Sequence, residues 1–142
     1  MDQRLTIVSL GVRDLATALA FYRDGLGWRP SSASSGDFVL FTLSGGLGLA
    51  LYPRELLAAD AGIADRDGFA GFAAVTLAQN VASREEVDAL LVEAERAGGS
   101  LLCPAAEKPW GYTGYFADPD GHPWEIAYVP SLPLAGGMLA TD

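Results

Sequence analysis

One order of predicted elements occurs twice along this chain of 142 residues. Alternating apolar residues predict a strand over residues 5–12, and the Asp14 that follows is a typical helix N-cap. Strand-like runs come after the helix at residues 28–32, 38–43 and 47–52, and Ser- and Gly-rich turns separate them. The first half of the chain therefore has the predicted order βαβββ.

The helix after Asp14 carries one apolar stripe. Its members recur at helical spacing and are Leu15, Leu19, Tyr22 and Leu26. Gly25 and Gly27 favour a helix end at this point. We expect this stripe to pack on the sheet of its own unit.

The second half of the chain repeats this order. A strand is predicted over residues 72–81, and Ser83-Arg84-Glu85-Glu86 is a capping box that opens a helix closed by Gly98-Gly99. A short helix over residues 54–59 is predicted in the polar connection between the halves. The remaining strand-like segments of the second half are residues 100–103, 112–117 and 124–128.

Such a duplication constrains the architecture. Each unit covers one face of its sheet with its own helix, so the other face needs a partner, and two units packed together enclose a cavity. We expect a single α+β domain with a first unit over residues 4–52, a connection over 53–69, a second unit over 70–130 and a tail over 131–142. The tail is rich in Pro, Gly and Ala, and we expect it to be an exposed arm or to cross onto a neighbouring subunit.

Composition excludes several classes of protein. Hydrophobic residues make up 50% of the chain and charged ones 19%, which is too apolar for disorder, yet no apolar run is long enough to span a bilayer. The start has no basic segment followed by an apolar one, so it resembles no secretory leader and we expect the cytoplasm. A net charge of −9 with nine Lys and Arg argues against nucleic acid as a partner and favours a cationic or neutral small molecule. The single cysteine, Cys103, excludes an internal disulfide, and we expect it to be a buried apolar residue rather than a reactive thiol.

The most specific stretch runs from Asp118 to Glu125 and reads DPDGHPWE. Its first four residues are typical of a tight turn, and a predicted strand with alternating apolar residues follows directly. Together with LGVRDL at residues 10–15 and Phe21-Tyr22, it resembles the vicinal-oxygen-chelate superfamily, which includes glyoxalase I, extradiol dioxygenases, fosfomycin-resistance enzymes and bleomycin-binding proteins. The resemblance covers about residues 5–130 and implies a glyoxalase/bleomycin-resistance-type fold, two βαβββ repeats around a central cavity.

Catalytic members of that superfamily hold one divalent metal through His or Glu residues on the first and last strands of each unit. The resemblance places these positions at Ile7, Ala50, Thr76 and Glu125, with Ala74 replacing Thr76 if the strand is shifted by two. Only Glu125 among them can bind a cation, and one carboxylate is not a metal site. We therefore expect no metal cofactor, and the metal-dependent activities of the superfamily are in doubt.

Two polar residues near the turn are candidates for chemistry. If Glu125 keeps the orientation of its counterparts, its carboxylate lies in an apolar cavity, where it needs a raised pKa or a ligand cation as partner. His122 is the only histidine, and it is either a general base or replacement ligand or, as we favour, a solvent-facing turn residue.

Aromatic residues supply the other candidate contacts. The segment Trp110-Gly111-Tyr112 would form a loop at the cavity mouth and offer stacking surfaces, with core packing as the rival interpretation. For Phe38, Phe41, Tyr52 and Tyr115 the strand register leaves open whether they line the cavity or pack on a helix, whereas Trp28, Phe21 and Phe116 are interpreted as core. The predicted ligand-binding residues are Ile7, Ser9, Phe41, Ala50, Tyr52, Thr76, Trp110, Tyr112 and Glu125.

Three hypotheses of function follow. The leading one is a metal-free protein of the bleomycin-resistance kind, which sequesters a small cationic or aromatic ligand and so confers antibiotic resistance. The second is a glyoxalase-type lyase or isomerase that acts through Glu125, with or without a divalent metal completed by misaligned residues or a second subunit. The third is a domain that acts through its protein surface. A homodimer is expected, because each half leaves an open sheet edge that members of the superfamily commonly cover by dimerising, either side by side or by exchanging halves.

Overall fold

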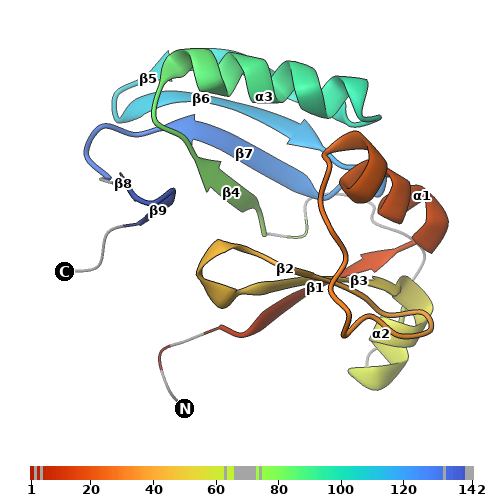
Figure 1. Cartoon of the computed structure of the whole chain (residues 1–142). Helices are drawn as coiled ribbons and strands as arrows, with labels where there is room; N and C mark the ends of the chain where they lie inside the picture. The colour runs from red at the N-terminus through yellow and green to blue at the C-terminus, as the bar shows by residue number, and fades with distance from the viewer. Residues whose placement is uncertain are drawn as a thin grey trace. The chain divides into compact units, whose positions relative to one another are not determined.

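The structure is a computed structural model in which the chain divides into two compact units, Met1–Ala74 and Val75–Asp142. Each unit is a small sheet with helices packed on it, coloured red to yellow for the first and green to blue for the second (Figure 1). The structure describes residues 1, 3, 5–62, 64–65, 73, 75–132 and 134–139. Among the helices of these residues, none has the length and apolar character needed to cross a membrane.

The first unit has a three-stranded sheet in the order β1-β3-β2. Strand β1 runs parallel to β3, and β2 runs antiparallel to β3. The elements are β1 (Ile7–Val12), α1 (Leu15–Leu19), the π-helical turn η1 (Ala20–Gly25), β2 (Val39–Thr42), the short turn η2 (Ser44–Gly46), β3 (Gly48–Pro53) and α2 (Arg54–Asp60). The short helix predicted in the connection is therefore confirmed as α2.

The first helix begins where the sequence predicted. The Asp14 side chain accepts hydrogen bonds from the backbone N–H groups of Ala16 and Thr17, at 2.8 and 3.1 Å. The helix then widens into η1, where the N–H of Leu26 donates to the carbonyl of Phe21, five residues earlier, at 2.9 Å. The buried side chains of α1 and η1 are those of Ala18, Phe21 and Tyr22, at helical spacing i, i+3 and i+4.

The prediction of a strand over residues 28–32 is wrong. Only an isolated bridge forms there, between Pro30 and Phe41. Proline has no N–H to donate to a ladder, and Gly27 turns the chain at φ +71° just before it. Ser31 still donates to the Leu40 carbonyl at 2.6 Å, so the segment follows β2 without becoming a full strand.

The second unit has a four-stranded sheet in the order β4-β7-β6-β5, with β4 parallel to β7 and the other pairs antiparallel. The Ser83 hydroxyl accepts from the Glu86 N–H at 3.2 Å, and the Glu86 carboxylate accepts from the Ala82 N–H at 2.9 Å, which confirms the capping motif. The elements are β4 (Leu77–Asn80), α3 (Arg84–Arg96), β5 (Ser100–Lys108), β6 (Gly111–Ala117), β7 (Pro123–Tyr128), β8 (Leu134–Ala135) and β9 (Met138–Leu139).

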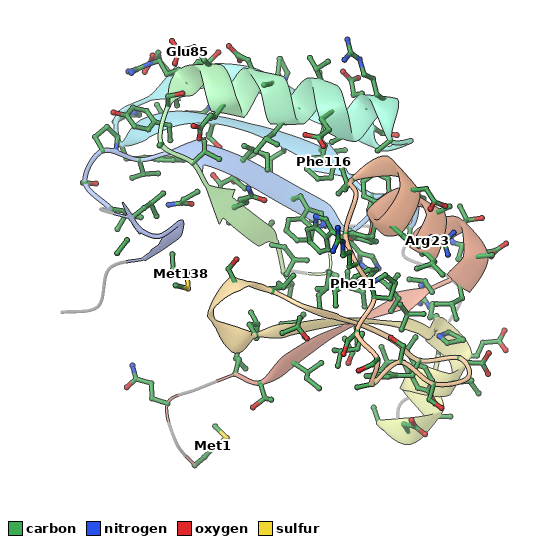
Figure 2. The ribbon with its side chains drawn as sticks, in the orientation of Figure 1. Met1, Arg23, Phe41, Glu85, Phe116 and Met138 are labelled. Carbon is green, nitrogen blue, oxygen red and sulfur yellow. The ribbon has the colours of Figure 1, made fainter. Side chains whose placement is uncertain are left out.

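Helix α3 lies across one face of this sheet (Figure 1). It buries Val87, Leu91 and Ala94, while Glu85 at its start lies on the outer side (Figure 2). Strand β6 carries Gly114 directly beneath the helix, and a Cβ atom at that position would lie 2.5 Å from Leu91 Cδ1. Glycine therefore sets how closely α3 approaches the sheet.

The boundaries of three other predicted segments differ. Strand β5 extends to Lys108, five residues beyond the predicted end, and its pairing with β6 shifts register on both sides of Cys103. Cys103 is exposed on it, so the prediction of a buried cysteine is wrong. Strand β4 begins at Leu77 instead of Phe72, and Phe72 lies outside the described residues. The predicted tail contains the short pair β8 and β9.

Candidate functional site

The sheet of the second unit brings four side chains into one row. Strand pairing sets Cys103 opposite Tyr115, Tyr115 opposite Glu125, and Glu125 opposite Ala78. Neighbours in a row project from the same side of a sheet, and residues on each strand alternate between its sides. Because Gly114 lies beneath α3, this row projects from the opposite side, which we call the Glu125 face.

The Glu125 carboxylate contacts a hydroxyl group from β6. The Thr113 hydroxyl lies 3.0 Å from Glu125 Oε1 and 3.0 Å from the Ile126 carbonyl oxygen, and it can donate to either. Thr113 is 2% exposed, whereas Glu125 is half-buried. Tyr115 lies opposite Glu125 on the neighbouring strand β6. A carboxylate has about four lone-pair directions, so Glu125 retains capacity for a further donor.

Tyr115 stays protonated at neutral pH. Burial raises the pKa of its phenol, and the neighbouring charges of Glu125 and Cys103 raise this pKa further. The ordinary phenol pKa is already about 10. Tyr115 therefore offers a hydroxyl donor on the same face of the sheet as the Glu125 carboxylate.

The other predicted site residues of the second unit lie apart from this group. Thr76 is exposed just before β4, and the β4 residue opposite Glu125 is Ala78. Trp110 is 46% exposed in the turn between β5 and β6. Tyr112 lies on the α3 side of the sheet, where its hydroxyl donates to Asp88 at 2.9 Å. Of the two tyrosines, Tyr115 therefore lies on the Glu125 face and Tyr112 lies on the other face.

In the first unit, four of the predicted residues share one face. Ile7, Ser9, Ala50 and Tyr52 alternate together by the pairing of β1 with β3, and we call their side the Ala50 face. Phe41 lies on the other side and is 1% exposed (Figure 2). Its ring centroid is 5.9 Å from that of Tyr22 and 5.6 Å from that of Trp28. Phe41 is therefore a residue of the core beside η1.

The two units differ at equivalent positions. Tyr115 opposite Glu125 in the second unit corresponds to Leu40 opposite Ala50 in the first. These equivalent positions are therefore polar in the second unit and apolar in the first. Within the described ranges, no three His, Cys, Asp or Glu side chains converge as a metal site would require.

The turn before β7 fixes the position of Glu125. Asp118 is 3% exposed, and its carboxylate accepts from the N–H groups of Asp120 and His122 at 3.0 and 2.9 Å. The His122 side chain is half-buried in this turn. Counting outward from the turn sets Tyr115 opposite Glu125, so the sequence contained the signal for that pair. Thr113 was missed; the same count sets it opposite Ala127, on the same side of the sheet as Tyr115 and Glu125.

Comparisons with known proteins place this geometry in a family. The sequence model of the glyoxalase/bleomycin resistance protein/dioxygenase superfamily matches residues 4–126. A solved glyoxalase-related enzyme from Fulvimarina pelagi is 35% identical with a TM-score of 0.85, over 99% of this chain and 98% of that chain. A glyoxalase/bleomycin resistance protein/dioxygenase from Nocardioides is 26% identical with a TM-score of 0.75, over 100% and 91%. A lactoylglutathione lyase from Agrobacterium tumefaciens, at 23% identity and a TM-score of 0.61 over 89% and 94%, shows a likeness of fold alone. No curated protein matches the chain.

Proposed function

Because the chain belongs to the glyoxalase/bleomycin resistance protein/dioxygenase superfamily, we propose that it binds a small organic ligand on its Glu125 face without a metal ion. One observation carries the proposal. Glu125 is a half-buried carboxylate with the Thr113 hydroxyl 3.0 Å from its Oε1, and it retains capacity for another donor. Such a group binds a ligand directly, and sequestration requires no catalytic residue.

The chemistry of the face indicates the ligand class. Glu125 offers a charged acceptor, and the net charge of −9 attracts cations to the chain as a whole. Ala78, its neighbour on β4, is small and exposed, which leaves the carboxylate accessible from that side. We therefore favour an ammonium or amidinium group with N–H donors, attached to an aromatic body. The proposal includes that the protein is a cytoplasmic homodimer. It confers resistance by sequestering such a molecule.

A second function is supported by the pairing of Tyr115 with Glu125 on neighbouring strands. A phenol beside a carboxylate can form a pair that holds and transfers a proton, as a glyoxalase-type lyase or isomerase requires. The relative from Fulvimarina pelagi is described as a glyoxalase-related enzyme. Under this alternative, Glu125→Gln abolishes turnover and leaves substrate affinity nearly intact, because the group acts on the transition state.

Benzamidine and its neutral analogue benzamide test the binding proposal. Calorimetry should detect benzamidine binding to the wild-type protein, and Glu125→Gln should weaken it roughly 5- to 100-fold, the usual loss for a charge-assisted hydrogen bond. Cys103 supplies a second readout, because it lies in the same row and is exposed, so a bound ligand should slow its alkylation.

The matched control is Glu93→Gln, which makes the same charge change on α3, where the side chain is exposed. It should leave binding and alkylation unchanged. Equal affinity of benzamidine for the wild type and Glu125→Gln, or equal affinity of benzamide and benzamidine for the wild type, contradicts the proposal.

A further inference from the structure

A bulge in β5 places two consecutive leucines on the α3 side of the second sheet. Leu101 lies opposite Phe116 of β6, which is two residues from the glycine beneath α3 and therefore on the α3 side. Cys103 projects from the opposite side, so Leu102 next to it also projects on the α3 side, as the extra residue of the bulge. Leu101 is 39% exposed and Leu102 is 52% exposed. Helix α3 therefore leaves part of this side of β5 uncovered.

One flank of α3 adds a third exposed apolar side chain. This flank faces β5, because the Arg84 side chain donates to Glu107 of β5 at 2.7 Å. Val92 lies one turn after Asp88 and two turns after Arg84, so it belongs to the same flank, and it is 45% exposed. We call Val92 and the two leucines the apolar shelf. The apolar shelf extends from α3 to the outermost strand of the sheet.

Acidic side chains border the apolar shelf. Asp88 and Glu95 lie one turn before and one turn after Val92, and both are exposed. Helix α3 as a whole has five acidic and two basic residues, and the second unit has ten acidic and three basic ones. A surface of this kind repels a second copy of itself and attracts a partner of positive charge.

We propose that the apolar shelf and its acidic border dock a basic amphipathic helix of a partner protein. A helix fits this place because it can lie alongside α3 and contact the shelf with apolar side chains at three- and four-residue spacing. Lysine or arginine residues on its flanks then lie close to Asp88 and Glu95. An added strand is disfavoured, since Pro104 and the register shifts of β5 interrupt the edge of the sheet. This docking surface lies on the side of the sheet away from Glu125 and does not depend on the function proposed there.

Three model peptides test the chemistry of the partner. The first is an amphipathic helix of leucine and lysine about as long as α3, and the second carries glutamate in place of each lysine. Fluorescence anisotropy with the full chain should show saturable binding of the lysine peptide and at least about tenfold weaker binding of the glutamate peptide. The third peptide has the composition of the first in an order without an apolar face, and it should bind at least about fivefold more weakly. Equal affinity of the first peptide and either of the others would overturn the proposal.

Variants assign the binding to the apolar shelf. Leu102→Ser should weaken the lysine peptide about three- to tenfold. Its matched control is Leu132→Ser, at a leucine that is 46% exposed between β7 and β8, and this variant should bind as the wild type does. Glu95→Lys should also weaken the lysine peptide about three- to tenfold, whereas Glu93→Lys, on the opposite flank of α3, should weaken it at most about twofold.

The location of the site can fail separately from its chemistry. Wild-type affinity in Leu102→Ser and in Val92→Ala would show attraction by charge alone, and equal losses in Leu102→Ser and Leu132→Ser would place the peptide elsewhere. If Leu102→Ser does not fold, Val92→Ala still decides, because that side chain is exposed and alanine favours the helix. Glu125→Gln should leave peptide binding unchanged, and a loss in that variant would move the peptide to the Glu125 face and overturn the docking surface.

Discussion

Replacing Thr113 by valine tests the contact that holds Glu125. The side chain is 2% exposed, and the change removes its hydroxyl with almost no change in shape. A hydrogen bond to a charged group contributes about 1.5–3 kcal/mol, and the buried methyl that replaces the hydroxyl returns about 0.8 kcal/mol. We expect a net loss of about 1–2 kcal/mol in the free energy of unfolding, or about 3–6 °C in Tm.

Urea unfolding followed by circular dichroism measures this loss. Thr42→Val is the matched control, because Thr42 lies on β2 with an exposed side chain, and this variant should stay within about 0.5 kcal/mol of the wild type. Thr113→Ser keeps the hydroxyl and should lose only the contribution of its buried methyl, about 0.8 kcal/mol. If Thr113→Val proves as stable as Thr42→Val, the hydroxyl does not hold Glu125 and the reasoning about the site fails.

Three other outcomes are expected. The pKa of Tyr115 is raised in the folded state, so the unfolded state loses the phenol proton first, and the free energy of unfolding should fall as pH rises above about 10. The fall should be smaller in Tyr115→Phe. If the phenol were unperturbed, urea titrations of the two proteins at pH 8 and 11 would show no such difference. Gly114→Ala should lower the free energy of unfolding by about 1–3 kcal/mol, since the new Cβ would meet Leu91. The same substitution should cost less in a protein that already carries Leu91→Ala. If calorimetry shows that the two losses simply add, this contact does not cause the destabilisation. Elemental analysis of protein purified without chelators should find no stoichiometric transition metal, and about one per chain would contradict the metal-free proposal.

The family and the α+β fold of two βαβββ-like units were predictable, and both are confirmed. The decisive signals are local. A helix cap such as Asp14 or Ser83 depends on hydrogen bonds within three residues, and the turn from Asp118 to His122 sets the register of the hairpin around it. Opposite pairs such as Tyr115 and Glu125 then follow by counting.

What could not be predicted depends on contacts between distant elements. Which face of the sheet α3 covers, the one with Tyr112 or the one with Tyr115 and Glu125, is decided by helix packing, and a strand sequence with large residues on both sides does not specify it. The same applies to Phe41, whose partners lie in η1. Cys103 is exposed because β5 is the outermost strand of its sheet, and strand order is a property of the whole unit.

Strand β5 carries a consequence for assembly. It is nine residues long and lies at one end of the sheet, where a second chain could extend the ladder. Pro104, in its middle, offers no N–H to such a ladder, and the two register shifts beside Cys103 interrupt the regular spacing of donors and acceptors. Strand addition at this end is therefore disfavoured, which protects the protein against sheet-to-sheet aggregation. A homodimer of this chain is accordingly expected to join through surfaces other than the outer edge of β5.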